Sequence, residues 1–361
     1  MTLQQLRELA GITLALLAEQ LQGLPRMVGI GAGGLAVFCI FCAVVRGLWG
    51  RRAVVRLRRS LLVLGLAAAL LWAGRALVPT AAPADDWFAA LTVQELPDPP
   101  ELQAEAALLI DVTEGQILYQ KNTADPIAPA STAKLLTALT VWQLCSADEW
   151  VTVGNEQSQV AFDASVAGLQ KGDRMTVRDL TAAMLLPSGN DAAYALAAHA
   201  GRVIAGQAAD TDAALNAFRK AMDQTARQLG VNSSRFVRPD GYDADHQHTT
   251  VQDLARIAHA FSQNQELAAL AAAPAMTVTT EGGRTLELTN TNLLLQPTGE
   301  YYHPAVTGLK TGRTTAAGSC LITTAAQNGR QYLCLVMHST EQGRWADTLA
   351  LLAAAETFAA K

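Results

Sequence analysis

Apolar and polar residues are arranged in three ways along this chain, and each arrangement predicts a different kind of structure. Residues 27–45 form an apolar run without a charged residue, and residues 61–78 form a second run whose only charge is Arg75. Each run is long enough to cross a bilayer as a helix. From residue 104 onward, short segments follow either the period of a helix or the period of a strand. The pattern therefore predicts two N-terminal transmembrane helices followed by a globular domain.

The loop between the two apolar runs, residues 46–60, carries six arginines and no acidic residue. Positive charge of this kind is typical of cytoplasmic loops, so everything after residue 78 is expected to lie on the outer side of the membrane. The arginines, the second run and the segment Ala82–Ala84 also have the layout of a cleavable signal peptide. Both interpretations export the region that follows. We predict a membrane anchor over residues 1–78.

Residues 79–103 are rich in proline and contain scattered acidic residues. The prolines stand at positions 79, 83, 97, 99 and 100. Such a composition favours a stiff, extended chain that does not fold alone. We therefore predict a linker over residues 79–103 and place the start of the folded domain at residue 104.

The domain, residues 104–361, begins with strand patterns at 106–112 and 116–120, which a turn at 113–115 joins. Helical periods follow, and strand periods return before a last helix. The expected helices cover 131–145, 176–186, 191–201, 212–229, 249–263 and 341–359, and the later strands cover 277–279, 285–288, 319–325 and 332–337. Strands at both ends of a helical middle predict an α+β fold, in which helices pack on an antiparallel sheet.

The amino-acid composition of the chain argues against some classes of function. The 361 residues have a formal net charge of −5, and the basic residues gather near the N-terminus, so no nucleic-acid partner is expected. The five cysteines do not form a disulfide framework. Cys145, Cys320 and Cys334 have apolar neighbours typical of a core, and the strand pattern allows a bridge between the last two. His246 and His248 lack a carboxylate or cysteine cluster at ligand spacing. We predict neither a metal nor another cofactor.

Three short motifs carry the candidate chemistry, and the first is Ser131-Thr-Ala-Lys134. At this spacing on a helix, the two side chains lie on one face about one turn apart. A serine hydroxyl becomes a strong nucleophile only when a base takes its proton, and a lysine can be that base when burial or a nearby cation lowers its pKa. The apolar pair Leu135-Leu136 and a second lysine elsewhere would have this effect. Taken alone, the motif also fits a helix N-cap followed by a solvated lysine.

The second motif, Ser188-Gly-Asn190, lies between two expected helices. Gly189 would allow a tight turn that aims both polar side chains in the same direction. In a catalytic interpretation, Ser188 passes a proton to the leaving amine, and Asn190 holds the substrate and Lys134 by hydrogen bonds. In the alternative interpretation, Asn190 only caps the helix that starts at Asp191.

The third motif is Lys310-Thr311-Gly312, which Arg313 follows. A glycine in a strand often marks the close approach of a ligand or of another backbone. Lys310 and Thr311 would bind a substrate carboxylate, and Gly312 would leave room for the substrate. The alternative is an exposed strand lysine beside a bulge. Together and in this order, however, the motifs resemble those of class A β-lactamases and penicillin-binding proteins, because they supply a nucleophile, a base, a proton relay and a carboxylate anchor.

Longer stretches make the resemblance more specific. Residues 111–122 and 129–131 are similar to the opening hairpin and the nucleophile segment of the serine D-Ala-D-Ala carboxypeptidases, the low-molecular-mass penicillin-binding proteins of bacteria. The segments Leu186–Ala193, Pro239–Asp243, His248–Leu254 and Gly308–Ser319 resemble further signatures of that family. The likeness implies a penicillin-binding/β-lactamase-like transpeptidase fold. With the predicted anchor, it also implies a place in the bacterial cell membrane with the catalytic domain on the extracytoplasmic side.

The resemblance also implies a reaction on these residues. Ser131 would attack the carbonyl of the penultimate D-Ala of a peptidoglycan stem peptide ending in D-Ala-D-Ala, with Lys134 as general base. The backbone N–H groups of Ser131 and Arg313 would hold the oxyanion. Ser188 would help to protonate the departing D-Ala, whose carboxylate would rest on the third motif. Water activated by Lys134 would then release the tetrapeptide, whereas β-lactam antibiotics would acylate Ser131 and stay.

One departure from the family pattern and three alternatives remain. Gln252 stands where some relatives have a basic residue that helps to hold the carboxylate, so Lys310 or Arg313 must suffice. A β-lactamase is the first alternative, but the nearest match to its deacylating motif, residues 212–216, begins with aspartate and fits the start of a helix better. An endopeptidase that cuts peptidoglycan cross-links is the second. A non-catalytic module that binds the cell wall is the third.

Overall fold

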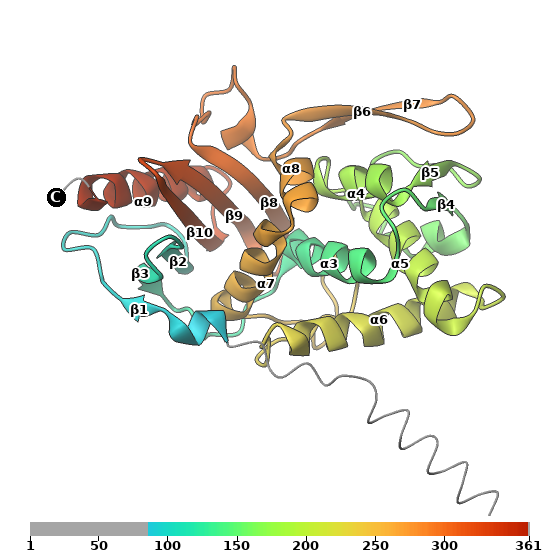
Figure 1. Ribbon diagram of the computed structural model, residues 1–361, viewed down its shortest axis with the longest axis horizontal. Coiled ribbons are helices and arrows are strands. Elements are labelled where there is room, and N and C mark those ends of the chain that lie inside the picture. Colours follow the sequence, from blue (N-terminus) through green and yellow to red (C-terminus); the bar gives the residue numbers. More distant parts are fainter. Residues whose placement is uncertain (1–85, 360–361) are drawn as a thin grey trace, which may run out of the picture. The chain divides into compact units, whose positions relative to one another are not determined.

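The computed structural model describes residues 86–359, and a six-stranded sheet is at the centre of this region. The strand order is β1-β3-β2-β10-β9-β8, in which β1 runs parallel to β3 and the other neighbours are antiparallel. The strands are β1 (Thr92–Val93), β2 (Ala106–Asp111), β3 (Gln116–Lys121), β8 (Val306–Thr314), β9 (Gly318–Gln327) and β10 (Arg330–Ser339). Because β2 pairs with β10, strands from both ends of the domain meet in one sheet, as predicted (Figure 1).

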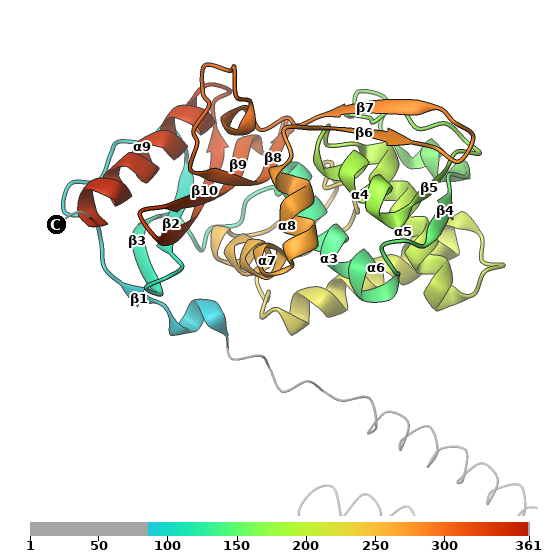
Figure 2. The ribbon, with the colours of Figure 1, turned by 45° about the horizontal axis from the view of Figure 1, so that its top comes forward.

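Helices cover both faces of the sheet and form a separate layer beside it. The α-helices of the described region are α3 (Lys134–Leu144), α4 (Val177–Leu185), α5 (Asn190–Ala205), α6 (Thr211–Gln228), α7 (Val251–Gln263), α8 (Gln265–Ala272) and α9 (Gly343–Ala359). Figures 1 and 2 show α9 on one side of the sheet and α7 and α8 on the other, with α3 to α6 gathered beyond them. This arrangement confirms the predicted α+β class.

The central strands are buried on both faces because they are apolar at nearly every position. On β2, Leu108 and Ile110 join the cluster formed with α3, α7 and α8. Leu109, which points to the opposite face, joins the cluster formed with Trp345 of α9. Helices on both sides therefore explain why this strand lacks the alternation of a half-exposed strand.

Shorter elements complete the described region. Two small two-stranded antiparallel sheets pair β4 (Trp150–Thr152) with β5 (Arg174–Thr176) and β6 (Ala275–Thr279) with β7 (Thr285–Thr289). The 3-10 helices are η1 (Trp87–Ala90), η2 (Ala130–Ala133), η3 (Asn155–Gln159) and η4 (Leu293–Leu295). The sequence patterns missed β1, β4 and β5 because two or three residues carry no periodic signal. They also missed α8, which follows α7 after one residue.

The end of the predicted linker belongs to the folded region. The ring of Trp87 stacks on His259 of α7, with ring centroids 3.7 Å apart. Beside it, Asp86 and Arg256 form an ion pair of 2.7 Å. For residues 86–103 the expectation of an extended stalk is therefore wrong, because aromatic and charged side chains in this segment find partners on α7.

The predicted transmembrane helices, 27–45 and 61–78, lie outside the described residues, as does the arginine-rich loop between them. Within residues 86–359, no helix combines the length and the apolar character needed to cross a membrane.

Cys145, Cys320 and Cys334 are buried, as their apolar neighbours predicted, and their thiols are free. Cys320 on β9 belongs to the cluster on one face of the sheet, and Cys334 on β10 belongs to the cluster on the other. Because their side chains point to opposite faces, the bridge that the strand pattern allowed does not form.

Candidate active site

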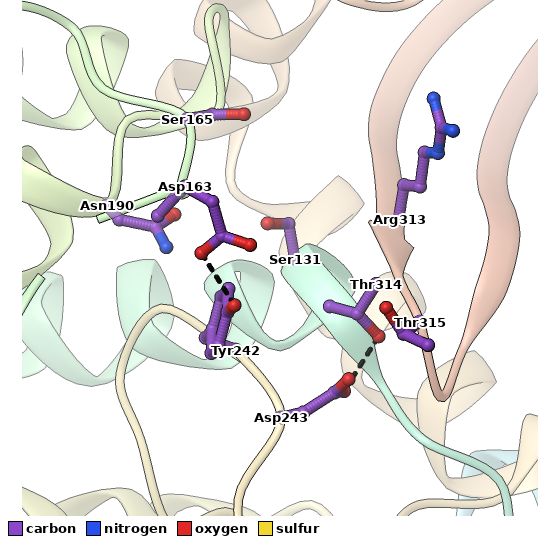
Figure 3. Close-up of a pocket in the computed structure, with 10 residues that line it drawn as sticks. Ser131, Asp163, Ser165, Asn190, Tyr242, Asp243, Arg313, Thr314 and Thr315 are labelled. Atoms are coloured by element: carbon purple, nitrogen blue, oxygen red, sulfur yellow. Dashed lines mark hydrogen bonds between the residues drawn. The ribbon is translucent and has the colours of Figure 1, made fainter. Parts of the chain in front are cut away.

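Ser131 lies in η2, directly before α3, and not at a helix N-cap. The loop 239–243 presses closely on this turn, because a Cβ atom on Gly241 would overlap the carbonyl oxygen of Ala130. Gly241 also has a φ of +76°, a value that favours glycine. The loop and the turn therefore hold each other in place. In Figure 3 the Ser131 hydroxyl points away from the helix axis toward Asn190.

Lys134, the first residue of α3, is fully buried, and its Nζ atom has three oxygen neighbours. Nζ lies 2.7 Å from Ser131 Oγ, 2.7 Å from Asn190 Oδ1 and 2.9 Å from the backbone oxygen of Asp240. The last two oxygens only accept hydrogen bonds. A neutral lysine has two N–H donors and one lone pair, so its donors satisfy these two acceptors while the lone pair faces the Ser131 hydroxyl. This arrangement suits a base that takes the serine proton.

Asp240 determines which way the Asn190 amide faces. Asn190 Nδ2 donates to Asp240 Oδ2 at 2.9 Å, which leaves Oδ1 for Lys134. The Asp240 carboxylate is itself buried, and it accepts hydrogen bonds from Arg238 Nε at 3.2 Å and from the backbone N–H of Tyr242 at 3.1 Å. Asn190 therefore links the base to a buried carboxylate. The interpretation of Asn190 as a simple helix cap is wrong, because Gly189 occupies the cap of α5.

Burial lowers the pKa of Lys134 to about 8, because the ammonium form loses its hydration. The negative charges of Asp240 and Asp191 raise this pKa, and the positive charge of Arg238 lowers it further. Burial is thus the largest cause of the lowered pKa of Lys134, and the nearby cation is Arg238 and not a second lysine. A base that titrates near neutral pH is well matched to proton transfer.

Ser188 lies in the turn between α4 and α5. Its φ is +63°, whereas Gly189 has a φ of −60°. The glycine is needed for a close approach instead, because a Cβ on Gly189 would lie 2.6 Å from the carbonyl oxygen of Ala183. Among the described residues, no hydrogen bond joins the Ser188 hydroxyl to Ser131 or Lys134. Its predicted role as a proton relay therefore stays a prediction.

Lys310, on β8, is as buried as Lys134 but has fewer partners. Among the described residues its Nζ donates only to the backbone oxygen of Thr311, at 3.1 Å. Burial, followed by the positive charges of Lys134 and Arg344, lowers the pKa of Lys310 well below its usual range. Thr311 Oγ1 lies 2.6 Å from Thr291 Oγ1. The alternative of an exposed strand lysine is wrong, and an incoming carboxylate would supply the negative charge that the surroundings of Lys310 lack.

Gly312 brings β8 against the turn that carries the candidate nucleophile. A Cβ on Gly312 would lie 3.0 Å from the Cβ of Ala130 and 3.3 Å from the backbone nitrogen of Ser131. The predicted close approach is therefore made by the protein's own backbone. Arg313 follows, but its guanidinium extends away from Ser131 and lies 3.3 Å from Glu341 (Figure 3).

A cleft of about 550 Å³ opens beside the Ser131 hydroxyl, and we call it the catalytic cleft. Tyr242 Oη donates to Asp163 Oδ1 at 2.7 Å, and Thr314 Oγ1 donates to Asp243 Oδ1 at 2.7 Å, so loops far apart in sequence are tied together around it (Figure 3). Its lining consists of Ser131, Asp163, Ala164, Ser165, Asn190, Tyr242, Asp243, Arg313, Thr314 and Thr315. Three of the predicted site residues, Ser131, Asn190 and Arg313, thus line it directly.

Asp191 fixes the loop that forms one wall of the cleft. Its carboxylate accepts hydrogen bonds from the backbone N–H groups of Ala167, Gly168 and Leu169, at 2.8 to 2.9 Å. The backbone N–H of Asn190 also donates to the carbonyl oxygen of Ser165, at 2.8 Å. The start of α5 therefore holds this wall in place beside the candidate nucleophile.

The sequence patterns did not identify Asp240, Asp191 or Asp163 as functional residues. Asp240 and Asp191 fall inside segments that carry the family resemblance, and acidic residues beside a tight turn or a helix start were the available signal. Asp163 stands in a segment without any motif. Its place in the cleft depends on a hydrogen bond to Tyr242, 79 positions later, which no local pattern reveals.

Two positions that the sequence singled out lie away from this chemistry. Gln252 of α7 donates through Nε2 to Thr123 Oγ1 at 3.2 Å, so it joins α7 to the loop after β3. Asp212 is in the first turn of α6, where the helix pattern placed it, and it lines a different pocket.

One group of side chains has the composition of a metal site. The ligand atoms of Cys145, Glu149 and His199 all lie within 4.8 Å of one another. His199 Nε2 lies 2.9 Å from Glu149 Oε1, and burial raises the pKa of the Cys145 thiol to about 12. A metal binds the thiolate form of cysteine, which this environment disfavours. We therefore interpret the group as a hydrogen-bonded pair packed beside a buried thiol.

Comparisons with known proteins agree with the geometry. A family model described as D-alanyl-D-alanine carboxypeptidase, Peptidase S11, matches residues 93–341. The D-alanyl-D-alanine carboxypeptidase DacD of Escherichia coli strain K12 is 33% identical over 260 residues, which are 69% of this chain and 62% of that protein. The D-alanyl-D-alanine carboxypeptidase of Streptomyces sp. strain K15 is 33% identical over 250 residues, 67% of this chain and 82% of that protein.

The fold has solved counterparts as well. The crystal structure of the Streptomyces K15 DD-transpeptidase superimposes with a TM-score of 0.65 at 29% sequence identity, and the match covers 72% of this chain and 99% of that one. This similarity supports the predicted penicillin-binding-protein-like α+β fold, with helices on an antiparallel-rich sheet. The chain therefore belongs to the peptidase S11 family of D-alanyl-D-alanine carboxypeptidases.

Proposed function

We propose that this protein is a serine D-Ala-D-Ala carboxypeptidase, which removes the terminal D-Ala from peptidoglycan stem pentapeptides and is inhibited by penicillin. The observation that carries the proposal is the environment of Lys134, whose Nζ lies 2.7 Å from Ser131 Oγ and has two acceptors as its other neighbours. Of these three groups, only the Ser131 hydroxyl has a proton to give. Family membership supports the substrate class, since the relatives are named for this activity.

In the acylation step, neutral Lys134 takes the Ser131 proton while Oγ attacks the carbonyl carbon of the penultimate D-Ala. The carbonyl oxygen becomes an oxyanion, and the backbone N–H groups of Ser131 and Arg313 stabilise it. When the intermediate collapses, the C–N bond breaks and the leaving amine receives a proton through Ser188. An ester between Ser131 and the shortened peptide remains.

Water then releases the peptide. Lys134 accepts a proton from the water molecule as it attacks the ester, and the Ser131 oxygen takes the proton back on leaving. The carboxylate of the departing D-Ala is bound throughout acylation by Lys310 and Thr311. Penicillin forms the same kind of ester with Ser131. Because Asp212, which begins the nearest sequence match to a deacylating motif, lines a separate pocket, we expect that ester to persist.

The site of action follows from the N-terminal sequence. The arginine-rich loop 46–60 between two apolar runs supports anchoring in the bacterial cell membrane, with the catalytic domain on the extracytoplasmic side, where peptidoglycan lies. Labelling of intact cells with a membrane-impermeant reagent, compared with lysed cells, tests this orientation.

The reaction is tested with the purified full-length protein and a peptide ending in D-Ala-D-Ala. We expect D-Ala release and labelling by fluorescent penicillin, and we expect Ser131→Ala to abolish both. Ser165→Ala is the matched control, because it removes another hydroxyl from the same cleft. Labelling without release, together with cleavage of a cross-linked peptide dimer, would replace the carboxypeptidase by an endopeptidase. If penicillin does not label the protein and D-Ala is not released, the non-catalytic module that binds the cell wall becomes the better interpretation.

A further inference from the structure

A second cavity lies between α5, α6 and the loop 237–239, and we call it the α6 pocket. Its volume of about 430 Å³ falls within the range of small-molecule sites, which begins at about 300 Å³. Leu215, Phe218 and Met222 of α6 give it apolar walls. The α6 pocket shares no lining residue with the catalytic cleft, and the reaction above does not use it.

Tyr194 of α5 brings a buried hydroxyl to the α6 pocket, and the proton of this hydroxyl has no acceptor. The side chain lines the pocket and is 5% exposed. Arg238 lies beside it, with its guanidinium carbon 5.7 Å from the centre of the ring, but a guanidinium has only donors. No other described residue accepts a hydrogen bond from the hydroxyl. A buried donor without a partner is costly, so a ligand that offers an acceptor there gains affinity.

Arg238 adds unused donors beside Tyr194. Its Nε donates to Asp240 Oδ1 at 3.2 Å, and its Nη2 donates to Asp240 Oδ2 at 3.3 Å and to the backbone oxygen of Gln159 at 3.1 Å. Its Nη1 has no carbonyl or carboxylate acceptor among the described residues. A hydroxyl and a guanidinium that both donate are best satisfied by a carboxylate, because its two oxygens accept from both.

The charges in the lining also favour an anion. The lining contains two arginines, Arg219 and Arg238, and one acid, Asp212. Asp212 is exposed, so water screens its charge. The side chain of Arg238 is only 24% exposed, so its charge is screened less.

We propose that the α6 pocket binds a small apolar molecule that carries one carboxylate group. The carboxylate accepts hydrogen bonds from Tyr194 Oη and Arg238 Nη1, and the apolar part of the molecule packs against α6.

Arg238 connects this pocket to the candidate active site. Its guanidinium pairs with the Asp240 carboxylate, which accepts from Asn190 Nδ2 and so leaves Asn190 Oδ1 for Lys134. The guanidinium also lies 5.3 Å from the ring centre of Tyr242, which lines the catalytic cleft. A ligand on Arg238 therefore acts on the groups around the base.

The charges that act on Lys134 determine the direction of this effect. Asp240 and Asp191 raise the pKa of Lys134, and Arg238 lowers it, while the charge of Lys134 in turn lowers the pKa of Lys310. A carboxylate bound at Arg238 offsets the guanidinium charge, so the pKa of Lys134 rises. Because acylation needs the neutral amine, a bound ligand slows it at pH 7. This consequence rests on the function proposed above.

Binding is tested with 4-phenylbutanoate and with its neutral analogue 4-phenylbutanamide, by ligand-detected NMR on the full-length protein. We expect 4-phenylbutanoate to bind with a Kd of about 1 mM and the amide to bind about tenfold more weakly. Tyr194→Phe keeps the ring and removes the unpaired donor, so it should weaken binding of the acid by about fivefold. Tyr302→Phe is the matched control, because Tyr302 is exposed and lies outside the lining of the α6 pocket.

A second variant fills the pocket. Leu215 is half-buried in the lining, and Leu215→Trp should abolish binding of 4-phenylbutanoate. Tyr194→Phe keeps the test decisive if Leu215→Trp does not fold. Equal binding of the acid and the amide, or equal binding by the parent and a folded Leu215→Trp variant, would overturn the site.

Labelling by fluorescent penicillin tests the connection to the base. Saturating 4-phenylbutanoate should slow labelling of the parent by about threefold at pH 7 and leave it unchanged at pH 10, where Lys134 is neutral in either case. Slowing that persists in Leu215→Trp would come from the acid in the catalytic cleft and would overturn the connection. If penicillin does not label the protein at all, the proposed function fails, whereas the binding measurements still decide whether the α6 pocket is a site.

Discussion

The two buried lysines of the cleft differ in surroundings far more than in burial. Lys134 is 0% exposed and Lys310 is 1% exposed. Lys134 has three oxygen partners and two nearby carboxylates, and its pKa is lowered only to about 8. Lys310 has one backbone acceptor among the described residues and two nearby cations, which lower its pKa further. Burial alone therefore does not determine what a lysine does.

The difference separates a base from an anion receptor. The oxygen network around Lys134 is complete within the protein, so this lysine needs only to gain and lose a proton. The surroundings of Lys310 lack a negative charge that a substrate carboxylate can supply. A buried cation without a counter-ion is costly, and a ligand that neutralises it binds correspondingly well. The predictions below test whether Lys134 acts as the base and Lys310 as the receptor for the substrate carboxylate.

Removal of the base should have the largest effect. Lys134→Met keeps an apolar chain of similar length but takes away the proton acceptor, so acylation by fluorescent penicillin should slow by about 10³-fold. Stopped-flow or gel-based labelling measures the rate. The matched variant is Lys310→Met, which should leave a much larger fraction of the labelling rate. Equal losses in the two variants would contradict the assignment of Lys134 as the base.

Removal of the anion receptor should weaken substrate binding. Lys310→Met should lower kcat/KM for a peptide with a free terminal carboxylate by about 10- to 100-fold, mostly through KM, because a charge-assisted hydrogen bond is lost. The control is the same peptide with an amidated C-terminus, which has no carboxylate to bind. The variant and the parent should cleave the amide at similar rates. A comparable loss on both peptides would indicate a structural role for Lys310.

The parts of the site that depend on the spacing of residues within one element could be predicted from the sequence. The spacing between Ser131 and Lys134 placed both side chains on one face of a predicted helix, about one turn apart, and the following leucines indicated burial. Gly312 indicated a close approach, which the turn at Ala130 makes. The alternation of strands and helices also predicted the sheet and most of the helices around it.

The groups that distinguish the two lysines were not predictable in this way. The backbone oxygen of Asp240 binds Lys134 across 106 positions, and Arg344 lies in the last helix of the described region. Such contacts depend on how distant elements pack, and periodicity within one element carries no information about them. The docking of residues 86–103 was missed for the same reason, since Trp87 depends on a histidine far along the chain.

The Asp240 carboxylate should influence the pH at which Lys134 acts as a base. Its negative charge raises the pKa of Lys134, so Asp240→Asn should move the pKa below the parent value of about 8. Acylation needs the neutral amine, so the parent rate should rise with pH and level off above about pH 8, and the variant should level off at lower pH. Penicillin labelling between pH 5 and 10 measures both profiles.

Asp240→Asn should also lower the stability of the fold, and this loss of stability must be separated from the change in the pKa of Lys134. Asn at position 240 loses the charge that pairs with Arg238, and we expect a loss of about 3 kcal/mol in the free energy of unfolding. Asp173→Asn is a suitable control, because it also removes a carboxylate paired with an arginine, Arg284, but outside the cleft. The control should change stability without moving the pH profile. An unmoved profile in Asp240→Asn would show that its charge does not act on Lys134.

The smallest expected effect is the uptake of a fraction of one proton when substrate binds, and it distinguishes the two lysines most directly. Because burial and neighbouring cations lower the pKa of Lys310 well below its usual range, a bound carboxylate should raise it again. At a pH between the free and the bound pKa values, binding therefore takes up a proton from the buffer. The uptake should vanish at lower pH, where Lys310 is already protonated in the free protein.

Calorimetry of the Ser131→Ala variant measures this uptake without turnover. The binding enthalpy of the D-Ala-D-Ala peptide is compared in buffers of different ionisation enthalpy, and its dependence on the buffer gives the number of protons. The amidated peptide and the Ser131→Ala/Lys310→Met double variant should show no uptake. Uptake that survives in the double variant would come from Lys134, and the two lysines would then share the response to substrate. If the uptake disappears in the double variant, Lys310 is the group that takes up the proton. This outcome is expected, because the oxygen network around Lys134 is already complete within the protein.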